Sequence, residues 1–255
     1  MLSTRRGKEI IQQALPALFI SPFCAADGES AEKSTLPNLK FEGPLIRWSG
    51  FSEAVQANTK DELFSLQGLP WHEFFEPDPI NDLESFKVRF HSRIGKELEE
   101  VLILQETNIK FAGYPCLIPY VGTGRTVMMS TAPTTIRAVG ELIVPWISVH
   151  SMQAVYDLED ELRVMLAQPI RYMQDLGCVY GFLSSYNETI FLRQRLIGGI
   201  WEVNYSPVIS GGFPSQYSDT EPRVSTRESF FYLAGLAAKT DPVSTVRPNW
   251  SFVDP

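Results

Sequence analysis

The chain has 255 residues, 44% of them hydrophobic, which is enough to bury the core of one large domain. Its formal net charge of −8 disfavours a nucleic-acid partner, because proteins that follow a phosphate backbone carry a basic surface. Three widely spaced cysteines indicate a reducing compartment, and three histidines leave few candidates for a zinc site or a Ser-His-Asp triad.

The N-terminal residues imitate the start of a signal peptide. Basic residues precede an apolar run at residues 14–20, but Glu9, Pro16 and Pro22 interrupt the pattern. We therefore expect a cytoplasmic chain whose first residues form a short amphipathic segment on the domain. Residues 21–44 are polar and broken by Pro and Gly, which is typical of a linker. No apolar run approaches the length of a membrane span, so we expect the chain to be soluble.

The pattern of apolar residues predicts one helix and then several strands. Residues 85–105 form the helix, because apolar side chains recur at three- and four-residue steps: Phe86, Phe90, Ile94, Leu98, Val101 and Leu102. Short runs rich in β-forming residues follow at 116–121, 126–130 and 136–146, separated by glycines and a proline.

A second helix is predicted over residues 157–176, with Gly177 as a left-handed cap. The acidic side chains in its first turn interact favourably with the helix dipole. Pro169 inside the helix predicts a kink or a break. A hairpin joins residues 179–186 to 189–196. A last helix is predicted over residues 220–239, where a serine and a glutamate, Ser225 and Glu228, have capping-box spacing.

Three segments share the frame of a known family. They are Gly140-Glu141-Leu142-Ile143-Val144-Pro145-Trp146, then Gln168-Pro169-Ile170-Arg171-Tyr172-Met173, then the hairpin from Tyr180-Gly181-Phe182 to Phe191-Leu192-Arg193. Together they resemble the fungal branch of the PD-(D/E)XK, restriction-endonuclease-like superfamily, over about residues 85–201. Members that keep the motif read Gly-Glu-x-Lys-x-Pro-Trp in the strand, followed by a Gln-x-x-x-Tyr-Met helix and a similar hairpin.

The resemblance implies an α/β fold, a restriction-endonuclease-like αβββαβ sandwich core with N- and C-terminal extensions. Residues 1–84 would form the N-terminal extension and linker that pack on the core. Residues 85–255 would form the nuclease-like core with a C-terminal helix and tail.

The chemistry of the family is incomplete in this chain. These nucleases hold a divalent ion between an aspartate and a glutamate, and a lysine activates water. Glu141 occupies the glutamate position, Ile143 replaces the lysine, and no Asp or Glu lies between Glu106 and Glu141. Glu97 or Glu100 could lend a second carboxylate, but the lysine would still be missing. We therefore expect no metal, no cofactor and no nuclease activity.

Structural roles compete with functional ones at these positions. Glu141 could be a buried acid satisfied by Arg125, Arg137 or backbone donors, because an isolated buried charge is costly. Gln168 could simply bond to backbone groups at strand ends.

In the nucleases, the acids and the lysine line the active-site cleft. Without them the cleft becomes apolar, which suits a small hydrophobic ligand. We expect Glu141, Gln168, Tyr172 and Arg125 to supply the catalytic groups. The substrate-binding wall is then formed by Trp146, Met128, Met129, Ile143, Tyr180, Phe182 and Tyr186. The hypothesis is a metal-independent enzyme of specialised metabolism that cyclises or isomerises an apolar small molecule by holding its reactive conformation.

The alternative is a module without catalytic activity that binds a protein or nucleic acid. It would bind through the cleft that holds the active site in nucleases of the family, or through the helix at residues 220–239. Acidity argues against nucleic acid but not against a protein. Oligomeric state stays open.

Overall fold

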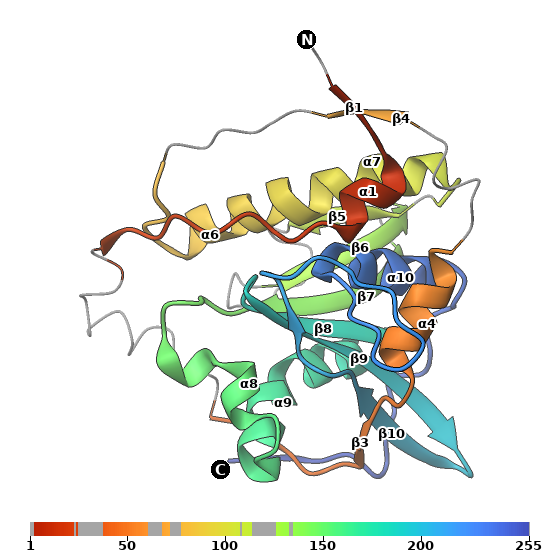
Figure 1. The fold of residues 1–255 in the computed structure, drawn as a ribbon. Helices are drawn as coiled ribbons and strands as arrows, with labels where there is room; N and C mark the ends of the chain where they lie inside the picture. Colours follow the sequence, from red (N-terminus) through yellow and green to blue (C-terminus); the bar gives the residue numbers. More distant parts are fainter. Residues whose placement is uncertain are drawn as a thin grey trace.

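The computed structural model describes residues 3–22, 24, 38–60, 68–71, 78–107, 109–113, 126–132 and 135–254. Within this part of the chain, eight strands form one mixed sheet with helices on both faces (Figure 1). The strand order is β3-β10-β9-β8-β7-β6-β5, and β11 pairs with β9. The strands are β3 Leu45–Arg47, β5 Lys110–Gly113, β6 Thr126–Ala132, β7 Thr135–Leu142, β8 Tyr180–Ser184, β9 Glu188–Ile197, β10 Ile200–Tyr205 and β11 Ile209–Ser210.

The connections place the predicted strands at 126–130 and 136–146 and the predicted hairpin in one sheet. Strands β5, β6 and β7 are antiparallel neighbours, whereas β8 runs parallel to β7 because helix α9 (Glu159–Leu176) crosses between them. Strands β8 and β9 form the predicted hairpin. The predicted strand at 116–121 lies outside the described residues, and β5 was not predicted. Strand β7 ends at Leu142, so the predicted strand at 136–146 is too long at its C-terminal end.

One face of the sheet is covered by a long helical segment made of α6 (Leu83–Phe90), a π-helical stretch (His91–Lys96) and α7 (Glu97–Leu104). This segment confirms the helix predicted at residues 85–105. Helices α1 (Gly7–Gln12), α4 (Phe51–Asn58) and α10 (Thr226–Ala238) complete this layer. Their apolar side chains form one core with the sheet, which includes Ile11, Phe51, Phe86, Phe90, Leu98, Phe182, Phe191 and Phe230.

Helix α9 covers the other face of the sheet, with α8 (Met152–Val155) beside it (Figure 1). A short 3-10 helix (Ser148–His150) precedes α8, and the strand pair β2 (Lys40–Phe41) and β12 (Phe252–Val253) packs nearby. The second core includes Phe41, Val139, Ile143, Leu162, Met165, Leu166, Ile170, Met173, Leu183 and Leu192. The described residues therefore form a helix–sheet–helix sandwich with two cores.

Helix α9 keeps the predicted C-terminal cap, because Gly177 has a φ of 64°. Its Cβ would lie 2.4 Å from the backbone oxygen of Val243, so both conformation and space require glycine. Pro169 does not break the helix. Its buried position on the apolar face explains this, because packing offsets one lost backbone hydrogen bond.

The last helix begins at Thr226, six residues later than predicted, and Ser225 caps it by accepting from the backbone N–H of Glu228 at 3.1 Å. The Glu228 carboxylate has other partners, so the reciprocal half of the capping box is not formed.

The N-terminal residues pack into the first core, where Ile10, Ile11 and Leu15 are buried. The backbone N–H of Leu15 donates to the carbonyl of Gly211 at 2.7 Å. Strand β1 (Ser3–Arg6) pairs with β4 (Gly68–Trp71). Within the described residues, no helix is both long enough and apolar enough to cross a membrane.

Candidate functional site on the α9 side of strand β7

Glu141 lies in the middle of the sheet, where β7 is flanked by β6 and β8. It pairs with Thr126 on one side and Leu183 on the other. Side chains alternate between the two faces of a strand, and Val139 and Ile143 both belong to the core under α9. Glu141 therefore shares the α9 face with these two apolar residues. Only 1% of its surface is exposed, so a carboxylate sits within an apolar layer.

Helix α9 brings two more predicted site residues to the same face. Tyr172 is 4% exposed and belongs to the same core as Ile143. Gln168 is half-buried one turn earlier, and residues four apart share one side of a helix. The structure thus places Glu141, Gln168 and Tyr172 on one side of the sheet.

The predicted aromatic wall is not on that side, and this part of the grouping is corrected. Tyr180, Phe182 and Tyr186 belong to the core on the opposite face, and Trp146 packs against the same core. Phe182 meets the ring of Phe230 at 4.8 Å and covers Gly140, where a Cβ would lie 2.3 Å from its ring. These rings fill the first core.

Two of these aromatic side chains have further structural partners. The Tyr186 hydroxyl donates to the carbonyl of Pro16 at 2.9 Å, and burial raises its pKa to about 12. Trp146 meets Phe86 edge-on at 6.1 Å. Both contacts tie separate segments of the chain to the first core.

Three predicted residues have no described side chain. On β6, Met128 pairs with Val139 and Met129 with Ala138, whereas Arg125 lies outside the described residues. Arg137, the other expected partner of Glu141, donates to the carbonyl of Thr240 at 2.8 Å and contacts Asp241 at 3.0 Å.

Glu97, the expected donor of a second carboxylate, lies on the opposite face of the sheet from Glu141. Its carboxylate forms an ion pair at 2.7 Å with Arg227, whose side chain is 1% exposed. Arg227 also donates to the carbonyl of Arg93 at 2.9 Å, and burial lowers its pKa. Glu100 is exposed on the same helix. The sheet thus separates both acids from Glu141.

The described residues contain no group of three or more His, Cys, Asp or Glu side chains placed to hold a metal ion. Residues 114–125, which precede β6, contain no Asp or Glu in the sequence. Neither the described residues of α7 nor residues 114–125 therefore supply a second carboxylate that could bind a metal ion together with Glu141.

A buried polar network near the start of α10 was not predicted. Glu228 is fully buried and accepts from the hydroxyls of Thr59, Ser215 and Tyr217, the last at 2.8 Å. Burial raises the pKa of Tyr217. The network joins α4, the segment before α10 and α10 itself. In the sequence, only the spacing of Ser225 and Glu228 marks this region, and that spacing predicts a helix cap.

Most of helix α10 is buried. Its residues Thr226–Ser229 are buried, and so are most of the apolar residues that follow. The docking role of residues 220–239 stays a prediction, and most of α10 belongs to the first core.

Comparison with protein-family models, with curated proteins and with solved structures finds no match to this chain.

Proposed function

We propose that this chain is a metal-independent enzyme that binds an apolar small molecule on the α9 side of β7 and promotes its cyclisation or isomerisation. One observation carries the proposal: the Glu141 carboxylate is 1% exposed between apolar Val139 and Ile143. The order of helix, three strands, helix and strand supports a nuclease-like αβββαβ core for this site.

The missing nuclease chemistry supports a different reaction. Ile143 is fully buried where the resemblance places the catalytic lysine. Glu97 is held by Arg227 in the opposite core, so it does not complete a cation site with Glu141. Hard cations require several oxygen ligands, and a single carboxylate is a weak site.

The polar groups of this face suit substrate orientation. A Tyr172 hydroxyl can donate to a carbonyl that gains negative charge, and such a donor acts strongly where water is excluded. Glu141 can orient that donor, and the half-buried Gln168 side chain offers both a donor and an acceptor. Apolar neighbours such as Ile143 hold a flexible substrate in its reactive conformation. None of these steps uses a cofactor.

The test is a thermal-shift screen of apolar metabolites against the wild-type chain, Glu141→Gln and Tyr172→Phe. Tyr232→Phe, on α10 in the opposite layer, is the matched control. We expect compounds that raise Tm in the wild type and the control but lose much of that effect in the two site variants. Active compounds are then incubated with the protein, and products are identified by mass spectrometry.

A parallel titration with manganese, followed by calorimetry, distinguishes the proposed enzyme from a metal-dependent nuclease. Manganese binding that Glu141→Gln abolishes, together with cleavage of DNA, would contradict the proposal. Compounds that bind to Tyr172→Phe and Glu141→Gln as tightly as to the wild type would show that the binding site lies elsewhere.

A second candidate is the interaction module, and the β9–β10 hairpin favours it. Leu196, Ile197 and Ile200 are 55%, 45% and 55% exposed around the Gly198-Gly199 turn. Contiguous exposed apolar residues often mark a protein contact. If this candidate is right, Ile197→Lys abolishes binding of a partner recovered from cell extract, while Tyr172→Phe leaves it intact.

A further inference from the structure

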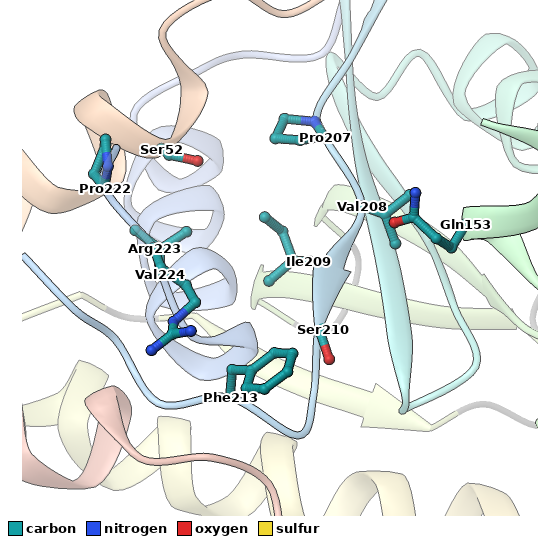
Figure 2. Close-up of a pocket in the computed structure, with 10 residues that line it drawn as sticks. All are labelled: Ser52, Gln153, Pro207, Val208, Ile209, Ser210, Phe213, Pro222, Arg223 and Val224. Atoms are coloured by element: carbon teal, nitrogen blue, oxygen red, sulfur yellow. The ribbon is translucent and has the colours of Figure 1, made fainter. Parts of the chain in front are cut away.

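A cavity lies away from the α9 side of β7. Its volume is about 340 Å³, and it opens between β11 and the extended segment that leads into α10 (Figure 2). The lining residues come from α4, α8, β11 and the two loops around them: Ser52, Gln153, Pro207, Val208, Ile209, Ser210, Phe213, Pro222, Arg223 and Val224. This volume is within the range of small-molecule sites.

Among the described residues that line the cavity, Arg223 is the one that carries a charge, and none is an acid. Its Nη2 atom donates to Gln216 Oε1 at 2.8 Å, and its guanidinium lies 5.1 Å from the centre of the Phe213 ring. Among the described residues, it forms no ion pair. A guanidinium has five N–H donors, so several remain for a ligand. In a chain of net charge −8, this site is locally positive.

The position of Arg223 is held by the backbone. Its N–H donates to the carbonyl of Gln216 at 3.0 Å, and the N–H of Gln216 donates back at 2.7 Å. This two-way bridge aligns the segment before α10 without using the lining side chains. A preorganised donor loses less entropy when it binds an anion.

The rest of the cavity is largely apolar. Ile209 on β11 and Val224 on the segment before α10 are buried, with 5% and 3% of their surface exposed. Both side chains line the cavity. Phe213 is 52% exposed, and Figure 2 shows its ring at the same end of the cavity as the Arg223 guanidinium. A large exposed ring beside a cation suits a ligand that has both an apolar body and a negative group.

We propose that this cavity binds a small organic monocarboxylate with an apolar body. Arg223 pairs with the carboxylate, and the apolar body packs between Phe213, Ile209 and Val224. One guanidinium matches one carboxylate in a two-bonded pair. Ser52, Ser210 and Gln153 supply polar contacts at the rim. This site is separate from the proposed enzyme site and does not depend on it.

The experiment uses nuclear magnetic resonance of the full chain with a panel of probes: benzoate, 1-naphthylacetate and decanoate, each beside its neutral amide. We expect at least one carboxylate to shift the backbone amides of residues 208–213 and 223–224. The matching amide should bind at least about tenfold more weakly, because the charge-assisted hydrogen bonds are lost.

Variants assign the effect to the cavity. Arg223→Gln should abolish the preference for the acid over the amide, and Phe213→Ala should weaken both. Phe213 and Arg223 are exposed, so both variants should fold. Arg195→Gln, an exposed arginine on β9, is the control and should keep the preference. The proposal is overturned if no probe shifts these amides, or if acid and amide bind the wild type equally. It also fails if Arg223→Gln keeps the preference.

Discussion

Replacing Glu97 by glutamine tests whether this acid stabilises the fold by pairing with Arg227 or binds a metal ion. The ion pair with Arg227 joins α7 to α10 at 2.7 Å, and the two side chains are 7% and 1% exposed. Glu97→Gln removes the counter-charge but leaves the guanidinium buried. Breaking a buried pair in this way costs about 3–5 kcal/mol. With an m-value of about 3 kcal/mol/M in urea, the unfolding midpoint should fall by roughly 1–1.7 M.

Urea unfolding followed by tryptophan fluorescence measures the effect. Glu100→Gln, on the exposed side of the same helix, is the control and should change stability by less than about 0.5 kcal/mol. The double variant Glu97→Leu with Arg227→Met should recover most of the loss, because an apolar pair of similar volume replaces the charges. The reasoning is refuted if Glu97→Gln and Glu100→Gln have the same midpoint, or if manganese stabilises the wild type but not Glu97→Gln.

Burial raises the pKa of Tyr186 from 10.0 to about 12, so its contribution to stability is present below pH 10 and is lost as the pH rises toward 12. Tyr186→Phe should flatten this part of the Tm profile, and an unchanged slope would contradict the assignment. Gly140→Ala should cost about 1–3 kcal/mol in urea unfolding, because its Cβ would lie 2.3 Å from the Phe182 ring, and Phe182→Leu should recover part of the loss. Burial raises the pKa of Cys178 to about 12, so iodoacetamide should label it more slowly than Cys24 in the native chain at neutral pH. Equal labelling rates before unfolding, measured by mass spectrometry, would contradict this.

Several elements could be predicted because their causes are local. The spacing of Phe86, Phe90, Ile94 and Leu98 reports one face of a helix, and the structure confirms that helix. Gly177 marks a left-handed cap for the same kind of reason. The start of α10 was placed too early. The carboxylate of Glu228 is turned toward Tyr217 and toward Thr59, which is remote in sequence, instead of the backbone of Ser225.

The candidate site was only partly accessible to sequence reasoning. Glu141, Gln168 and Tyr172 lie on the α9 side of the sheet, whereas Phe182 and Tyr186 belong to the opposite core. Alternation within one strand predicts which of its residues share a face. It does not say which face of β7 corresponds to which face of β8, because that depends on the register between strands.

The sequence by itself determined the main helices, the hairpin and the absence of a lysine beside Glu141, since each depends on neighbouring residues or on composition. Only the tertiary structure decided that Glu97 pairs with Arg227 and that Arg223 meets Phe213 beside a cavity. The physical reason is that such contacts depend on the packing of whole layers. A buried charge finds its partner wherever the folded chain brings one within reach.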